Sequence, residues 1–113
     1  MATDAFVANT PPRPLTDWER EVVSALAPGH DPDALRVHSH CPCGCASISF
    51  VPNLRQHTLL AEAEANDTDG VPVWFLLFGS DDRAELDELE IQRADGTPIR
   101  QPPDPHSLSP QQR

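Results

Sequence analysis

The sequence predicts an α+β domain in which one amphipathic N-terminal helix packs on an antiparallel sheet of about four or five strands. A helix-capping pattern followed by an apolar stripe of helical period predicts the helix. Short segments that alternate apolar and polar residues predict the strands, and proline clusters at both ends predict disordered termini. A chain of 113 residues has room for one hydrophobic core. We therefore divide the chain into a flexible N-terminal tail (1–14), a single α+β domain (15–100) and a disordered C-terminal tail (101–113).

The predicted helix begins after Thr16, in the sequence Thr16-Asp17-Trp18-Glu19. The Thr16 hydroxyl is placed to accept a hydrogen bond from the Glu19 amide, while the Glu19 side chain reaches back to Thr16. Apolar residues then recur at intervals of three and four, which gives the helix one apolar face. These residues are Leu15, Trp18, Val22 and Leu26. Pro28-Gly29 is expected to end the helix.

Several later segments have the features of strands. Residues 31–35 form a short helical turn, and residues 35–40 then become extended. The turn chemistry of 41–45 separates them from a second alternating segment, 46–51, as in a hairpin. Residues 71–78 are the most apolar run and the expected centre of the sheet. The predicted core consists of Trp18, Val22, Leu26, Ile48, Phe50, Val73, Phe75, Leu77, Leu89 and Ile91.

Two segments give mixed signals. Residues 59–65 alternate as in a strand, yet they are rich in Ala, Leu and Glu, which are strong helix formers; we favour a strand. In residues 83–93, Asp82 and Glu85 are placed to cap a helix. In the same segment Leu89 and Ile91 alternate with polar residues, as in an edge strand.

Two motifs flank the apolar run. One is Cys-x-Cys-Gly-Cys-x-Ser at 41–47, with Phe-Val after it, and the other is Leu-x-Glu-Leu-Glu-Ile-x-x-x-Asp-Gly-x-Pro-Ile at 86–99. The apolar strand between them ends in Leu-Leu-Phe and is followed by an acidic turn. This combination resembles a family of small, acidic, uncharacterised bacterial proteins and covers about three quarters of the chain, roughly residues 16–100. The resemblance implies a strand for 88–94, and it carries over no activity and no catalytic residue.

The basic residues are all arginine, and the chain has neither lysine nor tyrosine. This composition excludes a phosphate-binding lysine, a Schiff-base lysine and a tyrosine acid–base group. The formal net charge of −10 opposes binding to nucleic acid or to an anionic membrane. Residues 1–10 lack the features of a secretory signal, and no apolar run is long enough to cross a bilayer. Three cysteines within five residues suit a reducing compartment, so we expect a cytoplasmic protein.

Thiols and imidazoles are concentrated in residues 38–45, His-Ser-His-Cys-Pro-Cys-Gly-Cys. Both groups bind Zn(II) and Cu(I), so one hypothesis is a metal site formed by Cys41, Cys43, Cys45 and His40. Because side chains alternate along a strand, only a turn at 42–44 brings these ligands together. The sequence has no second cysteine pair, so His57 or His106 would have to complete a closed zinc site.

The same cysteines have other interpretations. Small, soft side chains often fill space beneath a hairpin turn, and this is the hypothesis that we favour. A redox pair is disfavoured, because Arg36 is the nearest fixed cation and acidic surroundings raise thiol pKa values. A nucleophilic dyad of Cys45 with His30 or His57 has no support beyond composition.

Most of the negative charge lies in one window of the sequence. Residues 61–95 contain eleven acidic residues and two arginines, which accounts for nine of the ten net negative charges. Like charges on neighbouring strands repel, which suggests a face that attracts a basic partner. The predicted partner-binding residues are Glu62, Glu64, Glu85, Asp87, Glu88 and Glu90. The alternative is a solvated surface that keeps an edge strand from pairing with other chains.

From these observations we expect a non-enzymatic, inhibitor- or immunity-like interaction module that binds a basic protein through an acidic face of its sheet. Paired carboxylates alone predict no hydrolase, because no apolar pocket is evident that would raise a carboxyl pKa. An interaction module of this kind is expected to need no cofactor. The alternative is a small Zn(II)- or Cu(I)-binding protein that uses the cluster at 38–45. The oligomeric state is not predicted.

Overall fold

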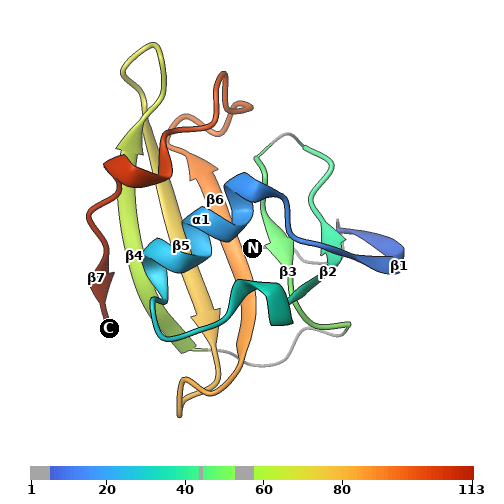
Figure 1. The fold of residues 1–113 in the computed structure, drawn as a ribbon. Coiled ribbons are helices and arrows are strands. Elements are labelled where there is room, and N and C mark those ends of the chain that lie inside the picture. The colour runs from blue at the N-terminus through green and yellow to red at the C-terminus, as the bar shows by residue number, and fades with distance from the viewer. Residues whose placement is uncertain (1–5, 44, 53–57) are drawn as a thin grey trace.

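The α-helix α1 (Asp17–Leu26) lies across one face of an antiparallel sheet in a computed structural model of the chain (Figure 1). The structure describes residues 6–43, 45–52 and 58–113. The strands are β1 (Val7–Pro14), β2 (Arg36–His40), β3 (Ile48–Ser49), β4 (Thr58–Asn66), β5 (Pro72–Gly79), β6 (Leu86–Arg93) and β7 (Gln111–Gln112). Two short 3₁₀ helices, η2 (Pro32–Ala34) and η3 (Pro105–Ser107), complete the described elements. The α+β class is therefore confirmed.

The sheet is larger than the sequence predicts. In the described part of the chain it has seven strands, in the order β1-β2-β3-β6-β5-β4-β7, and every pair is antiparallel. The expectation of four or five strands is wrong because segments near both ends of the chain join the sheet, as β1 and β7. Backbone groups make these pairings, so apolar side chains are not required for them and composition does not reveal them.

Both predicted tails therefore need correction. Residues Val7–Pro14 pair with β2 instead of forming part of a flexible tail, while residues 1–5 lie outside the described residues. The C-terminal segment crosses the helix, where the Trp18 indole Nε1 donates a hydrogen bond to the Pro103 carbonyl at 2.8 Å. Leu108 is buried in the core, and β7 pairs with β4. These contacts fix a segment that was expected to be disordered.

The helix begins and ends as predicted. Thr16 and Glu19 form both hydrogen bonds of the capping box, and the last helical residue precedes Pro28-Gly29. All the predicted core residues are buried except Trp18, which is half-buried and packs against Phe75 with 6.1 Å between ring centroids. The helix lies over the face of β4, β5 and β6 on which alternate residues are apolar.

The two ambiguous segments are both strands. Residues 59–65 belong to β4, where Ala61 and Ala63 are buried on the helix side and every second residue faces the other way. Residues 88–93 belong to β6, which pairs with β5 along almost its whole length. Pairing with the apolar β5 overrides the local helix preference, because tertiary contacts outweigh propensities of a few tenths of a kcal/mol, as a rough scale, per residue.

Among the residues that the structure describes, no helix has both the length and the apolar character needed to cross a lipid bilayer.

Candidate functional site

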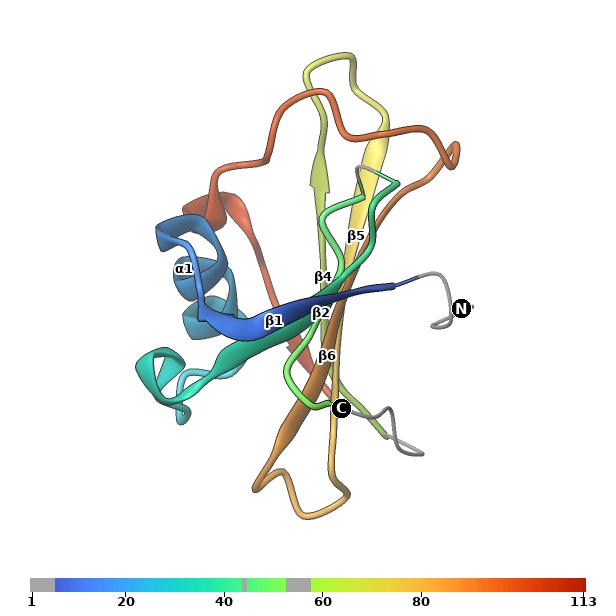
Figure 2. The ribbon, with the colours of Figure 1, turned by 90° about the vertical axis from the view of Figure 1, so that its right-hand side faces the viewer.

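The sheet face opposite α1 is the first candidate site. Figure 2 shows α1 on one side of strands β4, β5 and β6, with no described helix on the other side. Strand register places six side chains together there in two cross-strand rows. One row is Glu64, Trp74 and Gln92, and the other is Glu62, Leu76 and Glu90. We call these six residues the outer face.

The outer face has an apolar centre and acidic sides. Trp74 and Leu76 come from the middle strand β5, and carboxylates from β4 and β6 flank them, about 5 Å away per strand. Trp74 is 40% exposed, which is unusual for so large an aromatic residue, and its indole Nε1 donates to Glu64 Oε1 at 2.9 Å. A hollow of about 490 Å³ lies beside it, lined in part by Ser109 and Gln111 of the C-terminal segment.

Positive charge is scarce on this face. Within β4, β5 and β6 the only basic residue is Arg93, which lies on the helix side in register with Val73. Arg113, next to β7, forms an ion pair with Glu62 at the edge of the sheet. The carboxylates of Glu64 and Glu90 form no ion pair with any described residue, so the outer face presents negative charge to solvent around an exposed indole.

The six predicted partner-binding residues do not all share this face. Glu62, Glu64 and Glu90 lie on it, whereas Glu85 is exposed in the turn between β5 and β6. Asp87 and Glu88 are each only 1% exposed, so the expectation that they present charge to a partner is wrong. Adjacent residues of a strand point to opposite faces, and a bulge opposite Phe78 and Gly79 displaces Asp87 further.

Glu88 is a buried carboxyl group two residues before Glu90, on the same side of the sheet and in register with Phe78. Burial raises its pKa, and the nearby Glu90 carboxylate raises it further, to about 7. A carboxyl group with this pKa changes its charge near neutral pH.

The second candidate site is the turn between β2 and β3. The Sγ atoms of Cys41, Cys43 and Cys45 all lie within 4.8 Å of one another, and those of Cys41 and Cys43 are 2.8 Å apart. Cys43 is exposed and the other two are half-buried, so none of them belongs to the core. The three thiols therefore lie together, as the metal hypothesis requires, although Gly44 of the turn expected at 42–44 lies outside the described residues. The interpretation that the thiols fill space beneath the turn fits their exposure poorly.

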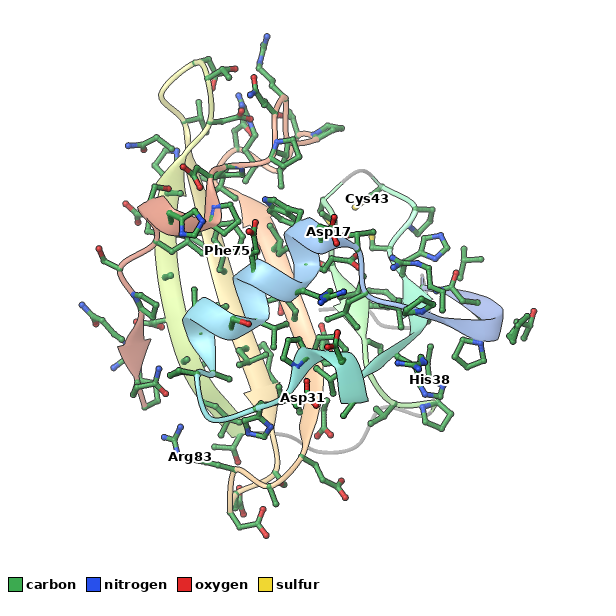
Figure 3. All side chains as sticks on the ribbon, in the orientation of Figure 1. Asp17, Asp31, His38, Cys43, Phe75 and Arg83 are labelled. Carbon is green, nitrogen blue, oxygen red and sulfur yellow. The ribbon has the colours of Figure 1, made fainter. Side chains whose placement is uncertain are left out.

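The described histidines do not join these thiols. His40 Nδ1 lies 3.1 Å from Asn9 Oδ1 instead, and His106 lies near Glu21 on the helix side. His38 and Cys43 lie well apart in Figure 3. His30 contacts the Arg83 carbonyl, at the opposite end of the molecule from Cys43 (Figure 3), so a dyad of Cys45 with His30 is not formed. His57 lies outside the described residues.

The thiols influence one another's protonation. Burial and a hydrogen bond with Cys43 raise the pKa of the Cys41 thiol to about 12. The Cys43 pKa is lowered, because the thiols of Cys41 and Cys45 donate to its sulfur. The Cys43 thiol therefore loses its proton more readily than the Cys41 thiol.

Ser47 is a structural residue of this site that the sequence reasoning missed. Its buried hydroxyl donates to the Ile91 carbonyl at 3.1 Å and accepts from the Ile91 amide at 2.9 Å. It also accepts from the Cys45 thiol at 3.3 Å. The serine of the Cys-x-Cys-Gly-Cys-x-Ser motif was the available signal, and its role is to fasten the cysteine turn to β6.

A buried charge network lies at the far end of β6 and was also missed. Arg93, 4% exposed, binds Asp67 at 2.8 Å, Asp69 at 2.6 Å and Asp95 at 2.8 Å. Burial raises the Asp67 pKa, but hydrogen bonds from the Arg100 and Thr68 amides and from Arg93 outweigh it and hold the pKa below its ordinary value. The Arg93 hydrogen bond likewise lowers the Asp95 pKa. These carboxylates have partners inside the protein, so they belong to the scaffold.

Comparison with known proteins identifies the family. Residues 12–103 match a family described as a domain of unknown function (DUF6984), and the chain belongs to that family. No curated protein matches the chain. No solved structure matches it either. The expectation of an uncharacterised family is thus confirmed, while the sites must be interpreted from their own geometry.

Proposed function

We propose that this protein is a non-enzymatic interaction module whose outer face binds a basic, partly apolar segment of another protein. The observation that carries this proposal is the exposed Trp74 next to the half-buried Leu76, with carboxylates on both neighbouring strands, on a sheet side that no described helix covers. Tryptophan is among the residues that contribute most to binding energy at protein interfaces.

The arrangement of charge suggests the chemistry of the partner. Glu62 and Glu64 on β4 and Glu90 on β6 attract lysine or arginine side chains, while the indole and Leu76 between them offer apolar contact. A segment that alternates basic and apolar residues satisfies both requirements. Phosphate groups of nucleic acid or of a membrane surface would be repelled by the same carboxylates.

Regulation of the partner is the role that suits such a module. A small acidic domain that covers a basic surface can block it, as an inhibitor or immunity protein does, and we propose this role for the outer face. The compartment that we propose is the cytoplasm, supported by three cysteines that are free thiols.

A peptide titration tests the proposal. The probe is a synthetic strand-length peptide that alternates lysine and leucine, and the reporter is Trp74 fluorescence in a Trp18→Phe background. We expect a saturable fluorescence change at low salt that weakens as salt is added, because the attraction is electrostatic. The double variant Glu62→Lys/Glu64→Lys should weaken binding by roughly tenfold or more, since like charges then face each other.

The matched control carries the same charge change elsewhere. Glu21→Lys/Glu85→Lys alters net charge by the same amount but leaves the outer face intact. If both double variants lose binding equally, net charge alone governs the interaction and the proposed face is wrong. A partner captured from cell extract counts as specific only when the wild type and the Glu21→Lys/Glu85→Lys variant retain it and the outer-face variant does not.

A further inference from the structure

Three thiols meet at the turn between β2 and β3 at a spacing suited to one metal ion. In an extended strand, side chains two residues apart stand about 6.5 Å from each other, and those four apart about 13 Å. The three sulfur atoms here lie within 4.8 Å of one another. Thiolates bound to one ion at about 2.3 Å lie about 4 Å apart, so the cluster needs only small side-chain adjustments to hold an ion.

The backbone around the thiols is fixed by the rest of the fold. The Cys41 amide donates to the Ser47 carbonyl at 3.0 Å, which closes the turn. Ala46 adopts a left-handed backbone conformation with φ of 68°, which is uncommon for a residue with a side chain. Ser47 then anchors the turn to Ile91 through both of its hydroxyl hydrogen bonds. The cysteine turn is thus held in place independently of any ion.

The surroundings allow an ion to enter. A cleft of about 390 Å³ separates the cysteine turn from β6, and all three cysteines line it together with Glu90, Arg93 and Thr97. Cys43 is exposed, so an ion can reach this thiol from solvent.

The number and type of ligands select the metal. We propose that Cys41, Cys43 and Cys45 bind one Cu(I) ion through three thiolate sulfurs, with the displaced thiol protons released to solvent. Thiolates are soft ligands that favour Cu(I), whereas structural zinc sites almost always have four protein ligands. Among the described residues the cluster contains no fourth metal-binding side chain. His40, which the sequence offered as that ligand, faces Asn9.

A chelator competition under anaerobic, reducing conditions tests this site. The full-length protein is titrated against the coloured Cu(I) complex of bicinchoninate, and native mass spectrometry reports the stoichiometry. We expect one copper per chain. Each single variant, Cys41→Ser, Cys43→Ser and Cys45→Ser, should lower the affinity by more than about tenfold, since even the loss of an outer hydrogen-bond partner costs about 10- to 100-fold.

His40→Gln is the matched control, because it removes a neighbouring metal-binding group outside the cluster, and its affinity should stay within about twofold of the wild type. Circular dichroism verifies that each variant is folded. Uptake that survives in the Cys41→Ser/Cys43→Ser/Cys45→Ser variant would overturn the proposal, and so would binding of Zn(II) in place of Cu(I) or an unchanged affinity in any single cysteine variant. The Glu62→Lys/Glu64→Lys variant should bind copper normally, which separates this site from the outer face.

Discussion

The buried carboxyl group of Glu88 makes the stability of the protein depend on pH. Its carboxyl group is 1% exposed, and its pKa is raised to about 7 by burial and by Glu90. Between the ordinary carboxyl pKa and about 7, the native state binds a proton that the unfolded chain has lost. Stability contributed by this group therefore falls as pH rises through that window, and the unfavourable charge is fully present above about pH 7.

The substitution Glu88→Gln removes this charge while keeping the shape of the side chain. We expect the variant to be more stable than the wild type by roughly 1–3 kcal/mol at pH 8 and about equal to it at pH 5, where Glu88 is protonated. Urea unfolding at the two pH values measures the difference. Glu21→Gln, on the exposed surface of α1, serves as the control. A stabilisation by Glu88→Gln of the same size at both pH values would contradict the buried-charge explanation.

At the same scale, the sequence placed some site residues correctly and others not. Alternation along β4 was enough to predict that Glu62 and Glu64 share a face. The same rule separates Asp87 from Glu88, which were grouped by charge although neighbours in a strand point in opposite directions. The bulge that displaces Asp87 has no clear sequence signal, because it arises from the pairing of β5 with β6. The predicted core took Val73, Phe75 and Leu77 from the apolar run and left Trp74 out, but nothing in the sequence indicated that Trp74 would lie exposed between carboxylates.

Among the elements, the end of β6 is fastened by the Arg93 network. Arg93 joins the β4–β5 turn through Asp67 and Asp69, and its own following turn through Asp95. Asp67 also accepts from the backbone amides of Arg100 and Gln101 at 2.7 and 3.1 Å, which attaches the C-terminal segment to the same point. One guanidinium therefore holds three stretches of chain together.

Arg93→Met should lower the unfolding temperature strongly, on the order of 10 °C or more at pH 7, because it leaves carboxylates without their buried counter-charge. The lowered pKa values of Asp67 and Asp95 mean that the network stabilises the protein above the ordinary aspartate pKa and loses its effect as pH falls below it. The difference between variant and wild type should thus shrink toward pH 3, as thermal melts followed by circular dichroism would report.

The exposed ion pair of Arg20 with Asp33 provides a comparison, and Arg20→Met should change the unfolding temperature by no more than about 3 °C. If Arg93→Met were equally mild, the network would be a surface feature and not the fastening that its burial suggests.

The elements that the sequence predicted well are those with local signals. The capping box defines where α1 begins, and strict alternation identifies β4 despite its helix-forming residues. Strands β1 and β7 have no such signal, because they are added to existing strands through backbone hydrogen bonds. The sequence predicted that the cysteines would come together only if a turn formed between them. It contained residues typical of a turn, but it could not give the distances between the three sulfur atoms.

In the whole molecule, the helix and the C-terminal segment cover one side of the sheet and leave the other side available (Figure 2). The C-terminal segment contributes to both sides. Leu108 is buried with the core, while Ser109 and Gln111 line the hollow next to Trp74. The C-terminal segment therefore contributes both to the core beneath the helix and to the hollow beside the outer face.

Deleting residues 102–113 tests this dual role. The deletion removes the hydrogen bond from Trp18 to Pro103, the buried Leu108 side chain and the pairing of β7 with β4. Burial of one leucine is worth roughly 1.5–3 kcal/mol, so we expect the unfolding temperature to fall by about 10 °C. Leu108→Ala should reproduce part of this loss while leaving β7 in place. Binding of the lysine–leucine peptide should weaken in the deletion, because Ser109 and Gln111 no longer line the hollow. Copper binding should persist, because β7 is at one edge of the sheet and the cysteine turn, between β2 and β3, lies toward the other edge (Figures 1 and 3). An unfolding temperature equal to that of the wild type would mean that the segment is not attached in solution, as its proline-rich composition alone suggests.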